Sequence, residues 1–155
     1  MLDIFKNNNN SELNFSMCVS TSRKIDIYWS DLESKLNESH KCKQIVFVDP
    51  IVLSFFPELV DLELSLPHLV IVPTNVGEKE KDIDTLLSIL SLLEQEGVGR
   101  RADKIYVVGG GVLLDVVSFA CSVFRRGVHL TKVPTTLLAY IDASIGIKTG
   151  INFMG

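Results

Sequence analysis

The stretch VVGGGVLLDVVSFACSVFRRGVHLTKVPTTLLAYIDASIGIKTGINFMG, residues 107–155, decides the fold of this chain. It begins inside an apolar run, residues 105–108, whose length and composition are typical of a buried strand. Three glycines follow at 109–111, and residues 112–124 then place apolar side chains at helical spacing. A strand, a glycine turn and a helix in this order bring free backbone N–H groups to a helix N-terminus, where phosphate groups bind.

The rest of the chain repeats this alternation. Further apolar runs predict strands at 45–48, 69–72 and 130–133. Helices are expected at 31–42, 50–59, 82–96 and 135–145. Two short runs near the N-terminus, 15–20 and 24–29, predict a hairpin or two edge strands. The alternation predicts an α/β fold, with a Rossmann-like parallel sheet and helices on both faces.

The composition indicates a globular protein with a proper core. Of 155 residues, 46% are hydrophobic and 22% are charged. The net charge of −4 argues against a nucleic-acid partner. The three cysteines are scattered without a CxxC pair, which favours a reduced, cytoplasmic setting.

Residues 105–124 have about the length of a membrane span, but the glycines and Asp115 within them favour a buried βα unit, so no membrane association is expected. Residues 1–12 contain a run of asparagines and no apolar core of a signal peptide. We therefore expect a disordered lead-in at 1–12 and a single α/β domain at 13–155.

Glycines and polar residues follow the predicted strands. Asp49, the charged loop 77–81, the glycines 109–111 and Thr135 each come soon after one strand. Ligands of parallel sheets bind outside the carboxyl ends of the strands, so we expect these loops to converge at one edge and bind a ligand there.

Each of these segments also has a purely structural interpretation. The glycines fit a plain tight turn, and Asp115 near the helix start fits a carboxylate that complements the helix dipole in the first turn. A charged loop such as 77–81 is commonly just solvated, and Thr135 and Thr136 fit helix N-caps. The residues alone leave both interpretations open.

Several polar residues of this chain also have the order and spacing found in a known protein family. GGGVLLD, FRRG and VPTTLLAYIDASIGIKTG resemble the signature of the 3-dehydroquinate synthase family, the sugar phosphate cyclases. The family shares the departure of GGGVLLD from the GxGxxG pattern. The positions that carry the resemblance are Asp115, Arg126, Thr135, Thr136, Asp142 and Lys148.

The resemblance implies that the domain binds NAD. In the family, Asp115 and Glu78 would accept hydrogen bonds from ribose hydroxyls, and Lys81 would donate to them or to phosphate. Asp49 matches a family aspartate near the adenine ribose, although Ile51 stands where the family often has Asn. The implied cofactor-binding set is Asp49, Gly77, Glu78, Lys81, Gly110, Gly111, Val112, Asp115, Thr135, Thr136 and Lys148.

The resemblance also implies residues that act on a sugar phosphate. Asp142 and Lys148 would be the catalytic pair, and both would bind substrate together with Arg126 and Asn152. An ammonium and a guanidinium suit a phosphate. In relatives the arginine matching Arg126 is lent across a dimer interface, which implies a homodimer.

The family's reaction makes a carbocycle from a sugar phosphate. It proceeds through transient oxidation by NAD, β-elimination of phosphate, re-reduction and aldol closure, with a divalent metal, zinc or cobalt. The metal ligands of the family, a glutamate and two histidines, lie in a second, helical domain that these residues do not match. His40, His68 and His129 lack a ligand spacing, so no metal site is expected in this chain. We expect only the NAD-binding half, as a fragment, a truncated gene product or a split subunit.

A few positions favour one possible substrate over another. The pairs Arg125–Arg126 and Asn152–Phe153 favour the 2-epi-5-epi-valiolone synthase branch, which acts on sedoheptulose 7-phosphate. Leu114 and Ser118 stand where 3-dehydroquinate synthases typically have glycine. The alternatives are a 3-dehydroquinate synthase of the shikimate pathway, a metal-dependent glycerol or alcohol dehydrogenase, and an inactive NAD-binding module.

Overall fold

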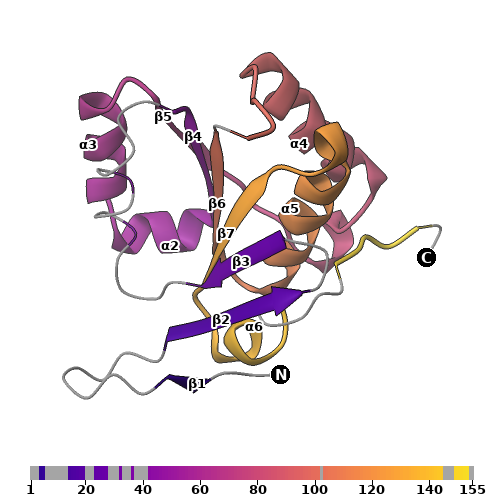
Figure 1. The fold of residues 1–155 in the computed structure, drawn as a ribbon. Helices are drawn as coiled ribbons and strands as arrows, with labels where there is room; N and C mark the ends of the chain where they lie inside the picture. Colours follow the sequence, from indigo (N-terminus) through magenta and orange to yellow (C-terminus); the bar gives the residue numbers. More distant parts are fainter. Residues whose placement is uncertain are drawn as a thin grey trace.

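The computed structural model describes residues 4–5, 14–19, 23–27, 32, 36, 42–101, 103–144 and 149–153. These residues form a seven-stranded sheet in the order β1-β2-β3-β7-β6-β4-β5, flanked by helices (Figure 1). The strands are β1 (Ile4–Phe5), β2 (Asn14–Val19), β3 (Arg23–Ile27), β4 (Gln44–Val48), β5 (Leu69–Pro73), β6 (Lys104–Gly109) and β7 (His129–Pro134). The helices are α2 (Pro50–Phe55), α3 (Glu58–Ser65), α4 (Ile83–Gln95), α5 (Gly111–Val123) and α6 (Leu137–Ile141), with 3-10 turns η1 (Glu78–Glu80) and η2 (Phe124–Arg126).

The sheet is parallel over most of its width. β7, β6, β4 and β5 pair in parallel, and β3 joins them on the far side of β7, also in parallel. β2 and β3 form the antiparallel hairpin expected near the N-terminus. Of the first twelve residues the structure describes Ile4 and Phe5, which pair with β2 as strand β1.

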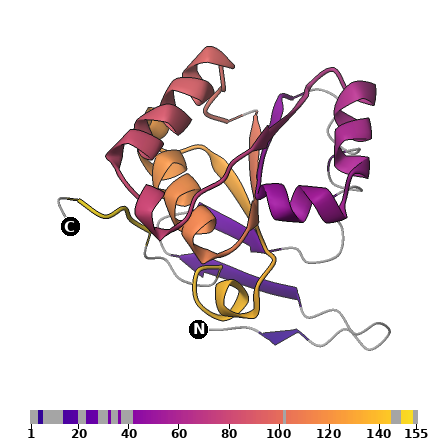
Figure 2. The ribbon, with the colours of Figure 1, turned by 180° about the vertical axis from the view of Figure 1, so that it is seen from behind.

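Helices cover both faces of the parallel strands, as the alternation predicts. α4 and α5 lie on one side of the sheet, and α2 and α3 lie on the other (Figure 2). Alternate strand residues divide between two cores. Ile45, Phe47, Ile105 and Val107 pack with α4 and α5, whereas Val46, Val48, Tyr106 and Val108 pack with the side of α2 and α3. Fully burying one such side chain contributes about 1.5–3 kcal/mol, so this division fixes the register.

One expected helix is wrong in its extent. The sequence predicts a single helix at 50–59, but α2 ends at Phe55 and α3 begins at Glu58. Pro57 lies between them as the residue before α3, and a proline cannot donate the backbone hydrogen bond that a continuous helix needs. Within 31–42, Leu32 and Leu36 are helical, and Leu36 is fully buried.

The unit formed by β6 and α5 confirms the interpretation of residues 105–124 as a strand and a helix rather than a span. Over the described part of the chain, no helix combines the length and the apolar character that crossing a membrane requires.

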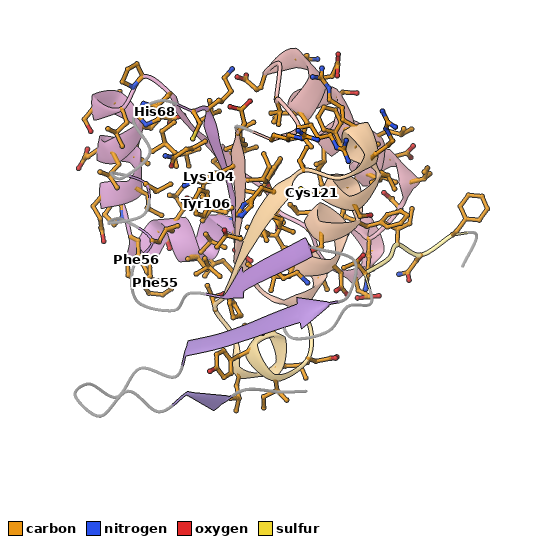
Figure 3. All side chains as sticks on the ribbon, viewed as in Figure 1. Phe55, Phe56, His68, Lys104, Tyr106 and Cys121 are labelled. Atoms are coloured by element: carbon orange, nitrogen blue, oxygen red, sulfur yellow. The ribbon has the colours of Figure 1, made fainter. Side chains whose placement is uncertain are left out.

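Among the described residues several large apolar side chains remain exposed, and many of them fall into two groups. One lies on α2 and α3 and includes Ile51, Phe55, Phe56 and Leu64; Figure 3 shows the two phenylalanines at the end of α2. The other lies on α6, where Leu137, Leu138 and Ile141 face solvent.

Candidate functional site

The loops that follow the parallel strands meet at one edge of the sheet. Backbone hydrogen bonds join them directly: the N–H of Asp49 donates to Val108 O at 3.0 Å, and the N–H of Thr135 donates to Gly109 O at 2.9 Å. The N–H of Thr74, just after β5, donates to Val48 O at 2.8 Å. The predicted convergence is therefore confirmed for the ends of β4, β5, β6 and β7, beyond which α6 lies (Figure 1).

The glycine turn lies in the middle of this edge. Gly110 is the N-cap of α5, has extended backbone angles and provides no side-chain cap. The first hydrogen bond within the helix runs from Leu114 N to Gly110 O at 3.1 Å. The amides of Gly111, Val112 and Leu113 therefore belong to the first helical turn, whose N–H groups lack partners within the helix and suit an anion.

Side chains from neighbouring segments pack against the three glycines, where a Cβ would otherwise lie. A Cβ on Gly109 would come within 2.7 Å of Leu113 Cδ2, which is closer than packing allows. On Gly110 and Gly111 it would lie 3.8 Å from Thr136 Cγ2 and 3.8 Å from Ala143 Cβ. The turn, Thr136 and the residues after α6 are thus neighbours, and a bare backbone at this junction fits the close approach of a pyrophosphate.

Asp115 lies one turn deeper than expected. α5 begins at Gly111, and its first turn holds no acidic residue, so the predicted first-turn position is wrong. The carboxylate instead forms an ion pair with Lys81, with Nζ and Oδ2 2.8 Å apart. The two side chains are only 18% and 23% exposed, so a largely buried ion pair joins the loop 77–81 to α5.

The loop 77–81 is also held by the segment 149–153. Asn152 Nδ2 donates to Glu78 Oε1 at 3.0 Å, and the Asn152 N–H donates to Lys81 O at 2.7 Å. Gly77 N donates to Glu80 Oε2 at 3.0 Å, which closes the loop upon itself. Two residues predicted for different roles, Glu78 for cofactor and Asn152 for substrate, are therefore in direct contact.

Besides Gly110, three of the predicted residues cap α-helices. Asp49 is the N-cap of α2, where Oδ1 accepts from Ile51 N at 2.8 Å. Thr136 is the N-cap of α6, where its hydroxyl accepts from Ala139 N at 3.2 Å. Asp142 is the C-cap of α6 and is exposed. Capping fixes the backbone of each residue at the edge and leaves part of each side chain for a ligand.

Arg126 lies apart from this group. It ends η2, between α5 and the start of β7, so it lies at the amino end of a strand whose carboxyl end leads to Thr135. The six residues of β7 span about 20 Å, and Arg126 is exposed at the opposite edge. Arg125 and Arg126 both have positive φ, 46° and 67°. Arg125 pairs with Glu94 on the surface, with Nη2 and Oε2 3.1 Å apart.

Lys148 and His40 lie outside the described residues. His68 and His129 lie at or before the amino ends of β5 and β7. Among the described residues no group of three or more His, Cys, Asp and Glu side chains is placed to hold a metal ion. The metal implied by the resemblance therefore does not fit the residues described here.

Sequence reasoning missed Lys132, on β7. Its side chain is 2% exposed, and its Nζ donates to Ala143 O at 2.8 Å. Burial lowers the pKa of Lys132, and the nearby Asp115 carboxylate opposes that shift. The signal in the sequence was a lysine within the apolar run 130–133, which is predicted as a strand.

The comparisons with known proteins agree with this geometry. Residues 71–155, more than half of the chain, match the family model described as 3-dehydroquinate synthase N-terminal. The chain is 46% identical over 91 residues to a 2-epi-5-epi-valiolone synthase of an Actinoplanes species, covering 59% of this chain and 23% of that one. It is 35% identical over 146 residues to a 3-dehydroquinate synthase of Sulfolobus acidocaldarius, covering 91% of this chain and 38% of the relative.

A solved structure is similar as well. It is ValA, a 2-epi-5-epi-valiolone synthase of Streptomyces hygroscopicus subsp. jinggangensis with NAD+ and Zn2+ bound, at 28% identity and a TM-score of 0.72. The match covers 89% of this chain and 39% of ValA, so the chain spans well under half the length of these relatives. The chain belongs to the 3-dehydroquinate synthase family of sugar phosphate cyclases and matches the N-terminal part of that family.

Proposed function

We propose that this chain is the NAD-binding part of a sugar phosphate cyclase whose substrate is sedoheptulose 7-phosphate. The observation that carries the proposal is the N-terminus of α5, which has no side-chain cap and lies where the loops after four parallel strands meet. This point falls within the stretch matched by the family model. ValA, which shares the fold, binds NAD+.

The residues at this edge suit a dinucleotide. The amides of Gly111 and Val112, after Gly110, would receive the pyrophosphate at the positive end of the helix dipole. The carboxylates of Asp115 and Glu78 would accept hydrogen bonds from ribose hydroxyls. Lys81, paired with Asp115, would offset the negative charge that a carboxylate brings near phosphate. The remaining members of the proposed cofactor site are Gly77, Asp49, Thr135, Thr136 and Lys148.

When bound, NAD supplies reversible acceptance of a hydride from the sugar. The chain's own residues would position the substrate. We assign Asp142 and Lys148 as catalytic residues that also bind the substrate, and Asn152 as a further substrate-binding residue. Lys148 would attract the phosphate by its charge.

Arg126 supports a homodimer. It lies about 20 Å from Thr135 along β7, at the other edge of the sheet, and its guanidinium suits a substrate phosphate. We propose that it serves the site of a second copy. No step is assigned to a metal, because the described residues hold no group that would bind one.

The choice of substrate rests on likeness to two valiolone synthases, one from Actinoplanes and one solved with NAD+. The alternative is a 3-dehydroquinate synthase. It is favoured by the Sulfolobus acidocaldarius relative, whose match covers 91% of this chain.

Calorimetric titration with NAD+ tests the cofactor site. We expect saturable binding to the wild type and at least a tenfold weaker affinity for Asp115→Ala, roughly 1.4 kcal/mol. Asp84→Ala, an exposed aspartate on α4, is the matched control and should bind as the wild type does. Absence of NAD+ binding by the folded wild type would refute the proposal.

Ligand-observed NMR on the NAD+-loaded protein then compares sedoheptulose 7-phosphate with the carboxylated precursor of 3-dehydroquinate. Preference for the second favours the alternative.

A further inference from the structure

Lys132 is a lysine inside the apolar layer of the fold. In register it lies beside Val107 of β6, whose side chain belongs to the core beneath α5. Its own side chain is 2% exposed. Lysine is almost never buried to this degree unless its ammonium is partnered. An apolar side chain of similar size would fill the same place without a charge to desolvate.

The partner of Lys132 is the turn after α6. Nζ donates to the carbonyl oxygen of Ala143 at 2.8 Å in a buried hydrogen bond. Ala143 follows Asp142, and its Cβ is the nearest neighbour of the space above Gly111. The hydrogen bond therefore joins strand β7 to the turn 142–144, which packs against Gly111.

Asp115, which forms the ion pair with Lys81 at 2.8 Å, also acts on Lys132. It does so through its charge, at a longer range than an ion pair. The negative charge of Asp115 favours the ammonium form of Lys132 and so opposes the effect of burial on its pKa. The direct contact of Lys132 with the site is the hydrogen bond from Nζ to Ala143 O.

We propose that Lys132 is a positioning residue of the NAD site, which holds the turn 142–144 in the arrangement that receives the dinucleotide. This inference rests on the proposed function. In this proposal Lys132 touches neither cofactor nor substrate and acts through its hydrogen bond to Ala143. The cost of burying its charge is consistent with a role in the site rather than in the core alone.

Lys132→Met tests the proposal, because methionine keeps most of the side-chain volume and removes the donor. We expect NAD+ to bind about tenfold more weakly or worse in calorimetry. Hydrogen exchange followed by mass spectrometry should become faster in 142–144, while α4 and the strands β4 and β6 keep their protection. Arg101→Met, which removes an exposed positive charge at the other end of β6, is the matched control. It should change neither measurement.

The two readouts separate the possible failures. Unchanged NAD+ affinity in Lys132→Met overturns the positioning role, and so does unchanged exchange in 142–144. Loss of protection throughout the domain, with unaltered affinity, would make Lys132 a core residue only and also overturns it. If the wild type fails to bind NAD+, the proposed function fails, while exchange in 142–144 still reports whether Lys132 holds the turn. Should Lys132→Met not fold, Lys132→Leu, which also lacks a donor, is measured by the same criteria.

Discussion

Lys81 forms an ion pair with Asp115, and Lys132 feels the charge of Asp115 at longer range. The two lysines should respond very differently to loss of this carboxylate. Lys81 is 18% exposed and can turn its ammonium toward water when the carboxylate is removed. Lys132 is 2% exposed, so its ammonium cannot reach water in the same way. Asp115→Ala therefore leaves the buried Lys132 without the carboxylate whose charge compensates it, whereas Lys81→Met leaves that carboxylate in place.

The magnitudes follow from burial. An exposed pair contributes about 0.2–1 kcal/mol, and removal of one partner from a buried pair costs about 3–5 kcal/mol. Lys81 is partly exposed, so we expect Lys81→Met to cost about 1 kcal/mol. Asp115→Ala also removes the charge that compensates the buried Lys132, but no direct ion pair with it, so we expect a cost between the two limits, about 2–3 kcal/mol. In a chain of this size, 1 kcal/mol lowers the melting temperature by about 2–4 °C. The double variant Asp115→Ala with Lys132→Met should regain stability relative to Asp115→Ala alone.

Urea unfolding followed by circular dichroism measures these differences, with calorimetric melting as a second probe. The single variants Lys81→Met and Lys132→Met, together with their doubles with Asp115→Ala, complete the thermodynamic cycles. A cost of Asp115→Ala no larger than that of Lys81→Met would refute a compensating role of Asp115 for Lys132. The same follows if Lys132→Met lowers the stability of Asp115→Ala by its full single-variant effect.

Further predictions concern the turn, the two cores and one cap. Gly109→Ala should destabilise by about 1–3 kcal/mol in urea unfolding, because the new Cβ would meet Leu113 Cδ2 at 2.7 Å; an unchanged midpoint would contradict this. Burial lowers the pKa of Lys132 from 10.5, so between the two values the unfolded chain binds more protons than the folded one. The stability of the wild type relative to Lys132→Met should therefore rise with pH in that window, and urea midpoints that fall with pH would oppose it. Burial raises the pKa of Cys121 to about 12, so a thiol reagent should leave it unmodified in the folded protein and label it after unfolding, as peptide mass mapping would detect. Thr136→Ala should cost about 1 kcal/mol through the lost cap of α6, and Thr136→Ser should retain most of it in the same urea assay.

Periodicity was sufficient for the parallel strands and their covering helices. The apolar run at 105–108 corresponds to β6, and the helical spacing from 112 corresponds to α5. These segments are long, apolar and flanked by glycine, so local pattern and tertiary burial agree. The break after Phe55 had a visible signal in Pro57, which was outweighed by the apolar spacing on both sides of it.

The contacts of the site could not be predicted in the same way. Lys81 and Asp115 are 34 residues apart, and Asn152 and Glu78 are 74 apart, so only the packed sheet brings them together. The strand pattern around Lys132 indicated a strand without indicating that its lysine faces inward. Its acceptor on Ala143 depends on how α6 packs against β7. The roles assigned to Asp142 and Asn152 stay predictions.

The turn after α5 restricts which residues its positions accept. Arg125 and Arg126 precede Gly127, and all three adopt positive φ, which costs a non-glycine residue about 1–2 kcal/mol. Glycine or asparagine would relax the backbone at either arginine, whereas a β-branched side chain would strain it further. Glycine at Arg126 should therefore raise the melting temperature, but it would remove the guanidinium that we propose to serve the site of a second copy.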